Sequence, residues 1–186
     1  SWVEKLLPFN LPMIQLRFKS NDAAEIEAQV SKAIEMTRNS QTKLFINDHW
    51  EMAIKYQAYG VHLGQSDLDT ADIAAIKNAG LKLGLSTHCY TEVARTHAIQ
   101  PSYIAIGPVF ETTTKQMPFQ PQGLDNLSRW VRTLSDYPLV AIGGIFKESN
   151  AKAVWDTGVS AIAVVRDITE CTNLEQHLAE WQALLI

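Results

Sequence analysis

Short apolar runs alternate with amphipathic segments along the whole chain. Each run is too short for a helix and too apolar for an exposed loop, as expected of a buried strand. Seven such strands are predicted, at Met13–Phe18, Lys43–Ile46, Gly60–Leu63, Lys82–Leu85, Tyr103–Gly107, Leu139–Ile142 and Ala161–Val165. The segments between them have helical spacing and predict helices at Asp22–Arg38, Trp50–Gln57, Thr70–Ala79, Thr91–Ile99, Leu124–Leu134, Glu148–Thr157 and Asn173–Leu185.

This alternation predicts an α/β fold with a parallel sheet, either a barrel or an open doubly wound sheet. Polar residues follow nearly every strand and the units are evenly sized, which favours a TIM (β/α)8-type barrel with its active site at the C-terminal ends of the strands. Only seven strands are predicted, and Trp2–Leu7 has the pattern of a helix end without a preceding strand. We therefore expect one barrel domain over residues 1–186 that lacks its first strand.

Composition narrows the classes of protein. With 46% hydrophobic and 19% charged residues the chain is expected to fold, and no apolar run reaches the roughly 18 residues of a membrane span. The N-terminus lacks a signal-peptide pattern, so we expect a cytoplasmic protein without a membrane partner. The net charge of -4 argues against a nucleic-acid partner. Cys89 and Cys171 are too few for a disulfide framework and are expected to be free thiols.

Hydroxyls and a cation follow the strand that starts at Tyr103. Gly107 and Pro108 end the apolar run, and Thr112, Thr113, Thr114 and Lys115 come directly afterwards. Three hydroxyls and an ammonium suit an oxyanion such as phosphate. A plain surface loop is the alternative.

The first predicted strand carries polar side chains at alternate positions. Gln15, Arg17 and Lys19 would share one face of an extended chain and present an array of donors. A solvated edge strand is the alternative, and it suits Lys19 better than the other two.

The next two strands end in carboxylates. Asn47 and Asp48 follow one strand and Asp67 follows the other, an arrangement that could hold Mg²⁺ together with substrate phosphate oxygens. Either aspartate could instead cap the helix that comes next. His62, inside its apolar strand, is interpreted as a hydrogen-bonded core residue.

Two later strands end in further candidates. Ser86 offers a hydroxyl for an oxyanion or a helix cap, and Gly143 with Gly144 would let backbone N–H groups approach a ligand closely. The sequence shows no Ser-His-Asp set, no His/Cys metal cluster and no nucleotide-binding P-loop motif.

Taken together, these motifs resemble the thiamine-phosphate synthase family over nearly the whole chain. The resemblance rests on Q-L-R-F-K from Gln15, F-I-N-D from Phe45, G-V-H-L-G-Q-S-D from Gly60, G-L-S-T-H from Gly84, I-G-P-V-F-E-T-T-T-K from Ile106, P-Q-G-L from Pro121 and V-A-I-G-G-I from Val140. It implies a (β/α)8 barrel that joins a pyrimidine-methyl diphosphate to a thiazole phosphate and releases pyrophosphate. The implied mechanism is dissociative and needs no protein nucleophile.

The resemblance also implies roles for individual residues. Arg17, Lys19, Asn47 and Lys115 would hold the diphosphate, Asp48 and Asp67 the Mg²⁺, Gln15 and Ser86 the pyrimidine, and Thr112, Thr114 and Gly144 the thiazole phosphate. Val165 and Arg166 end the last strand beside that phosphate. Arg166 stands where the family usually has a small hydroxyl residue, so it either adds a phosphate contact or fills the site.

Two alternatives to a synthase remain. A thiazole tautomerase resembles the synthase in fold and phosphate site but needs no grip on a diphosphate, so the diphosphate residues favour the synthase. A binding remnant without catalysis is suggested by Arg166 and by the missing strand. The missing strand would leave two unpaired strand edges, and we expect the chain either to be cut from a longer protein or to be poorly active.

Overall fold

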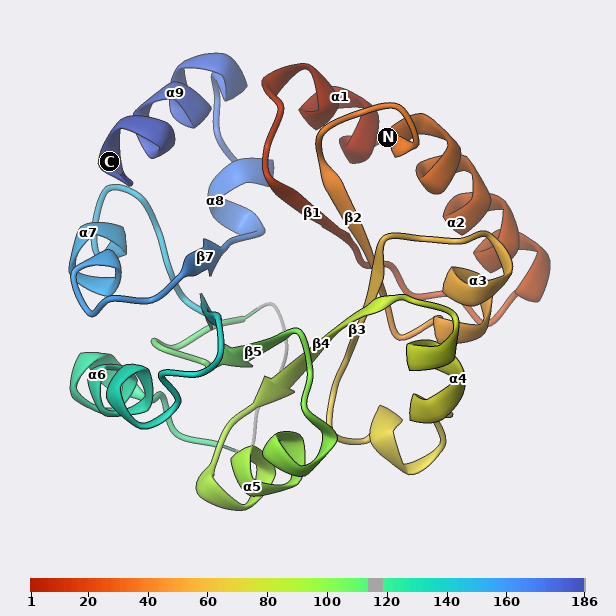
Figure 1. The fold of residues 1–186 in the computed structure, drawn as a ribbon. Coiled ribbons are helices and arrows are strands. Elements are labelled where there is room, and N and C mark those ends of the chain that lie inside the picture. The colour runs from red at the N-terminus through yellow and green to blue at the C-terminus, as the bar shows by residue number, and fades with distance from the viewer. Residues whose placement is uncertain (114–118, 186) are drawn as a thin grey trace. The chain divides into compact units, whose positions relative to one another are not determined.

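The computed structural model describes residues 1–113 and 119–185. Contacts among these residues group into two compact units, Ser1–Leu85 and Ser86–Ile186. Each unit consists of parallel strands connected by helices (Figure 1). That the whole chain forms one domain stays a prediction.

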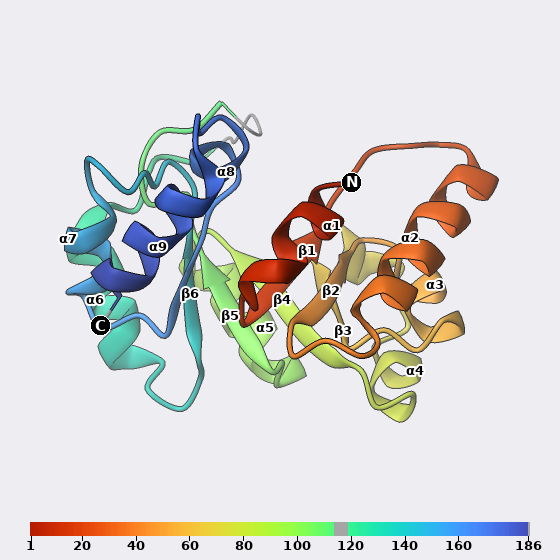
Figure 2. The ribbon, with the colours of Figure 1, turned by 90° about the horizontal axis from the view of Figure 1, so that it is seen from above.

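The first unit is built on three complete strands and the start of a fourth. Its strands are β1 (Met13–Leu16), β2 (Lys43–Asn47), β3 (Gly60–Leu63) and most of β4 (Lys82–Thr87), and its helices are α1 (Trp2–Leu6), η1 (Leu7–Phe9), α2 (Ala23–Thr37), α3 (Trp50–Lys55), η2 (Asp67–Asp69) and α4 (Ile73–Asn78). The strands pair in chain order and all are parallel. Helices α2, α3 and α4 lie along one side of them (Figure 2).

Side chains alternate between the two faces of β2 and β3, and both faces are buried. Leu44, Ile46, Val61 and Leu63 are almost fully buried and share one face of β2 and β3. On the other face Gln15 pairs with Phe45, and Asn47 pairs with His62. Asn47 and His62 thus place polar side chains on this second face, where both are buried beside Phe45.

The second unit continues the same order of elements. It contains the last residues of β4, then β5 (Tyr103–Ile106), β6 (Leu139–Ile142) and β7 (Ala161–Ala163), with α5 (Tyr90–Ile99), α6 (Gly123–Thr133), α7 (Ala151–Trp155), α8 (Arg166–Thr169) and α9 (Leu174–Leu184). Strands β5, β6 and β7 pair in parallel. The hydroxyl of buried Thr87 in β4 donates to the Ala105 carbonyl in β5 at 3.1 Å.

Parallel strands in chain order, connected by helices, form the topology of a TIM-type (β/α) barrel, so the predicted fold class is confirmed. The described residues supply seven strands, one fewer than a complete barrel of this type. Two predicted strands are shorter than expected, because β1 ends at Leu16 and β7 at Ala163. In the part of the chain that the structure describes, no helix is long and apolar enough to cross a membrane.

Candidate active site

A pair of carboxylates stands where β2 and β3 end. Asp48 directly follows Asn47, the last residue of β2, and its backbone N–H donates to the His62 carbonyl at 3.0 Å. Asp67 begins η2, and its Oδ2 accepts the Gly64 N–H at 2.7 Å. The first unit therefore brings together the two aspartates that the sequence proposed as metal ligands.

The carboxyl groups of Asp48 and Asp67 interact, and this interaction contributes to a raised pKa of Asp48. Partial loss of solvent raises the pKa of its carboxyl, and the charge of Asp67 and a hydrogen bond to Asp67 raise that pKa further. The positive charge of Arg17 acts in the opposite direction and lowers the pKa. Two adjacent carboxyl groups near a guanidinium form a ligand set suited to a divalent cation such as Mg²⁺.

Neither aspartate caps the helix that follows it. The N-cap of α3 is His49, without a side-chain hydrogen bond to the helix, and the N-cap of α4 is Asp72, whose carboxylate accepts the Ala75 N–H. The capping alternative is therefore wrong for both aspartates. Asp48 also has a left-handed backbone with φ 66°, which an aspartate tolerates better than most residues but not without cost.

The donor array expected on β1 is only partly in the strand. Gln15 lies within β1, whereas Arg17 and Lys19 come after its last residue. The expectation that all three alternate along one strand is wrong, because the pairing with β2 ends at Leu16 and Ile46. All three side chains are exposed, and Asn47 is buried at the end of β2.

His62 is a core residue, as interpreted from the sequence. His62 is 5% exposed, and burial lowers the pKa of its imidazole from 6.5 to about 4. The folded state therefore binds the proton less readily than the unfolded state. The free energy of unfolding should be unaffected above about pH 6.5 and should fall by up to about 3 kcal/mol as the pH drops from 6.5 to 4.

Denaturant titrations at several pH values would check this prediction. Comparison with His62→Gln isolates the histidine, because glutamine carries no proton in this range while the carboxylates contribute equally to both proteins. The variant should show a smaller loss of stability on acidification. Identical pH profiles for the two proteins would contradict the prediction.

The second unit gathers candidates at the ends of β4 and β5. Ser86 is the second-last residue of β4 and is half-buried, and Thr112 follows β5. Gln122 braces the region: its backbone N–H donates to the Pro108 carbonyl at 2.8 Å, and its side-chain amide donates to the His88 carbonyl at 2.7 Å. Thr114 and Lys115 lie outside the described residues.

The glycine pair after β6 allows a close approach of two loops. Gly143 and Gly144 have φ values of 90° and 69°. A Cβ on Gly144 would lie 2.5 Å from the Glu111 carbonyl oxygen and 2.8 Å from the Phe110 carbonyl carbon. Only glycine combines this backbone with so little space. The backbone of Gly144 is thus held directly against the segment that leads to Thr112.

Arg166 begins α8, two residues beyond Val164, and its guanidinium has a fixed direction. Nε and Nη2 donate to the two carboxylate oxygens of Glu170 at 2.9 and 3.1 Å, and Nη1 donates to the Thr113 hydroxyl at 2.9 Å. The guanidinium also lies 5.8 Å from the ring centroid of Phe146. The residue before it, Val165, is exposed.

Sequence patterns missed the residues that hold these candidates in place. The Asn150 side chain bonds the Gly144 carbonyl, Glu170 pairs with Arg166, and the Gln122 side chain bonds the His88 carbonyl, two residues after Ser86. The quoted motif P-Q-G-L contained Gln122 but gave it no role. Glu170 follows Arg166 by four residues, a helical spacing that could have indicated the ion pair.

The two units offer complementary chemistry. The first provides paired carboxylates with a cation nearby, which suits a diphosphate with Mg²⁺. The second provides hydroxyls, a glycine backbone and a guanidinium, which suit a phosphate monoester. Nearly all of these residues lie at or beyond the C-terminal ends of parallel strands, where barrels of this type carry their active sites.

Comparisons with known proteins point to one family. The family model described as thiamine monophosphate synthase matches residues 1–168. The thiamine-phosphate synthase of Neisseria meningitidis is 50% identical over 98% of this chain and 89% of its own length, and that of Yersinia pseudotuberculosis is 50% identical over 96% and 83%. The solved thiamine phosphate pyrophosphorylase from Pyrococcus furiosus has a TM-score of 0.85 at 28% identity, covering 98% of this chain and 87% of that chain.

Proposed function

The chain belongs to the thiamine monophosphate synthase family, and from this premise we propose how its residues carry out the synthesis of thiamine phosphate. The reaction joins 4-amino-2-methyl-5-pyrimidinylmethyl diphosphate to thiazole phosphate and releases pyrophosphate. The observation that carries the assignment of residues is the contact between Asp48 and Asp67 beside Arg17. A tautomerase would not need this arrangement.

In the proposed site, the diphosphate binds to Arg17, Lys19, Asn47 and Lys115. Asp48 and Asp67 would hold Mg²⁺, which neutralises negative charge on the departing diphosphate when it is bound. The two carboxyls repel each other when both are charged. Burial raises the pKa of Asp48, and this repulsion by Asp67 raises it further. With a divalent cation held between them, Asp48 and Asp67 would both stay ionised.

The two organic substrates bind to different residues. Gln15 and Ser86 hold the pyrimidine end of the diphosphate substrate. Thr112, Thr114, the Gly144 backbone, Val165 and Arg166 surround the phosphate of the thiazole. Lys115 and Thr114 enter this scheme from their sequence motif alone, since they lie outside the described residues.

The bond between the pyrimidine methylene carbon and the diphosphate oxygen breaks first in this scheme. Arg17 and Lys19 would stabilise the charge that develops on the leaving oxygen, because a cation favours negative charge that grows in the transition state. The thiazole nitrogen then attacks the methylene cation and forms the new carbon–nitrogen bond. No side chain has to act as a nucleophile.

Both substrates are multiply charged phosphates, for which transfer into an apolar membrane is very unfavourable. We therefore also propose that the protein acts in the cytoplasm, where such small molecules are made and used.

A pyrophosphate-release assay tests the function. Release should require both substrates and Mg²⁺, and thiamine phosphate should form in equal amount. A tautomerase would release no pyrophosphate, and a binding remnant would bind thiamine phosphate in calorimetry without turnover. Either result would overturn the proposal.

Arg166→Ser tests the phosphate end of the site. Removal of the guanidinium should raise the KM for thiazole phosphate about tenfold, as expected for the loss of one charge-assisted contact, with less than about a twofold change for the diphosphate substrate. Steady-state kinetics with each substrate varied in turn would measure both values. Equal effects on the two substrates, or none, would remove Arg166 from the site.

A further inference from the structure

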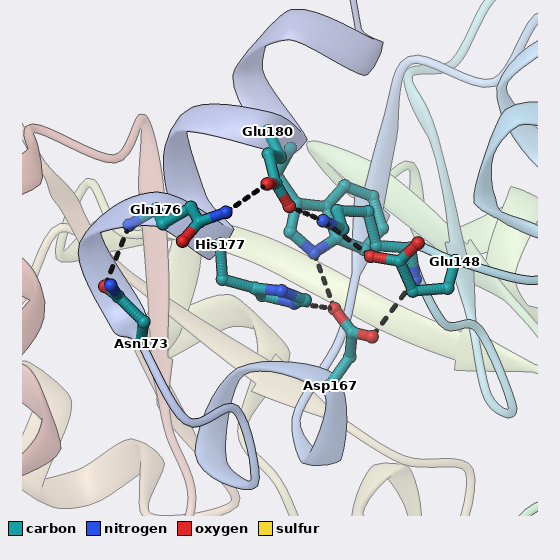
Figure 3. Close-up of polar contacts among 8 residues, drawn as sticks. Glu148, Asp167, Asn173, Gln176, His177 and Glu180 are labelled. Carbon is teal, nitrogen blue, oxygen red and sulfur yellow. Dashed lines mark hydrogen bonds and ion pairs between the residues drawn. The ribbon is translucent and has the colours of Figure 1, made fainter.

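A buried carboxylate lies directly behind the proposed phosphate site. Asp167 follows Arg166 in α8 and is 9% exposed. Its Oδ1 accepts the Lys147 backbone N–H at 3.0 Å, while its Oδ2 accepts the Trp181 indole N–H at 2.6 Å and lies 2.6 Å from Nε2 of His177 (Figure 3). Both carboxylate oxygens therefore have partners, as a buried charge requires.

The partners of Asp167 come from two separate parts of the second unit. Lys147 belongs to the loop of residues 143–150 that begins with the glycine pair, and His177 and Trp181 are on α9. One carboxylate thus ties that loop, α8 and α9 together. The loop and α8 are the two elements that carry Gly144 and Arg166.

The loop transmits this tie to Gly144 through a short chain of contacts. The Asn150 side chain donates to the Gly144 carbonyl at 3.0 Å and accepts the Phe146 N–H at 2.9 Å. Phe146 is the residue before Lys147, and its ring faces the Arg166 guanidinium at 5.8 Å. A displacement of Lys147 would therefore move both Gly144 and the ring beside Arg166.

The Lys147 ammonium is paired with carboxylates. Nζ lies 2.7 Å from the Glu148 carboxylate and also pairs with Glu180, and the side chain is 7% exposed. Glu148, Glu180 and His177 bring ligand-type atoms within 4.8 Å of one another, a spacing that could suit a metal (Figure 3). Because Lys147 already supplies a positive charge among these carboxylates, the cluster is interpreted as an ion-pair network.

We propose that Asp167 is a positioning residue for the thiazole phosphate. By holding the Lys147 backbone, it fixes the separation between the Gly144 loop and Arg166, and so sets how well a phosphate fits between them. The inference rests on the proposed function, which assigns Gly144 and Arg166 to that phosphate. Asp167 acts through these two residues without contact to the substrate.

The test replaces Asp167 by asparagine and by alanine in the full chain. Asparagine keeps the shape of the side chain and one oxygen to accept the Lys147 N–H, but its amide N–H would face the Trp181 N–H, where no hydrogen bond can form. Alanine removes all of these hydrogen bonds. The KM for thiazole phosphate should rise about tenfold in Asp167→Ala and less in Asp167→Asn, because a misplacement of about 1 Å is enough to cost this much. The KM for the diphosphate substrate and the kcat at saturation should change less than about threefold.

A matched control separates positioning from loss of stability. Leu127 on α6 is fully buried in the same unit and belongs neither to the loop of residues 143–150 nor to α8, so Leu127→Ala should lower the melting temperature without changing the KM for thiazole phosphate. If Leu127→Ala raises that KM as much as Asp167→Ala, the effect is general destabilisation and the proposal is wrong. Unchanged KM in both Asp167 variants would also overturn it.

Arg166→Ser distinguishes this inference from the proposed function. If Arg166→Ser raises the KM for thiazole phosphate and the Asp167 variants do not, only the role of Asp167 fails. If Arg166→Ser leaves that KM unchanged, the assignment of the phosphate site fails, and the role of Asp167 fails with it.

Discussion

Asp67→Ala is expected to lower turnover at least about a hundredfold at saturating substrates. Asp67 supplies one of the two carboxylates proposed to hold Mg²⁺, and neutralisation of a departing diphosphate by a metal is worth several kcal/mol. The remaining Asp48 would have to hold the cation alone beside Arg17. Asp48→Ala should have an effect of similar size, and activity of the unchanged protein should disappear with a chelator and return with added Mg²⁺.

Asp69→Ala is the matched control for this prediction. Asp69 ends the same short η2 helix and is exposed, so its replacement removes a carboxylate from the same turn while both proposed ligands are kept. Its turnover should stay within about threefold of the unchanged protein. The metal assignment would be wrong if Asp67→Ala retained full activity in the presence of chelator.

Gly144→Ala should impair both the stability of the second unit and its use of thiazole phosphate. The new Cβ would lie 2.5 Å from the Glu111 carbonyl oxygen, and the backbone φ of 69° is unfavourable for alanine. Strain and overlap together should cost about 3 kcal/mol of unfolding free energy. Relief of the overlap would push the segment before Thr112 away, so kcat/KM for thiazole phosphate should fall at least about tenfold.

Gly80→Ala separates these two causes. Gly80 has a φ of 77°, similar to that of Gly144, but a Cβ there would meet nothing within 4 Å. Its replacement should cost about 1 kcal/mol through the backbone alone and leave the kinetics unchanged. Denaturant melts and kinetics on both variants would decide the matter, and equal losses for the two would show that the contact with Glu111 is unimportant.

The periodicity of the sequence was enough to predict the strands and most helices. Buried strands such as β3 and β5 are short apolar runs bounded by glycine, and their pattern has no good alternative. The prediction that β1 extends to Phe18 was wrong. The alternation of side chains in the sequence continues to Phe18, but the pairing of β1 with β2 ends at Leu16, and β2 itself ends before Asp48. Helix α8 was missed because four residues are too few to show a helical period.

The position of polar residues after strands predicted the candidate site residues. It did not predict the residues that hold the loops of the site in place. Asp167 contacts Lys147 across 20 residues of sequence, and Gln122 contacts His88 across 34. Contacts of this separation leave no local pattern. The relation of Asp48 to Asp67 is similar: each aspartate alone was equally compatible with a helix cap. The folded first unit separates the two interpretations, because other residues cap α3 and α4 and the two carboxyl groups lie together.

The backbone of Asp48 has a consequence for laboratory evolution of this enzyme. The left-handed backbone of Asp48 and the nearness of its carboxyl to that of Asp67 both lower the stability of the folded protein. Glycine at this position would remove both costs, and the backbone cost alone is roughly 1 kcal/mol. A selection that rewards heat resistance alone would therefore favour the loss of a proposed metal ligand. Cells that carry a library of variants should therefore be grown under conditions in which survival depends on the thiamine phosphate that the enzyme makes.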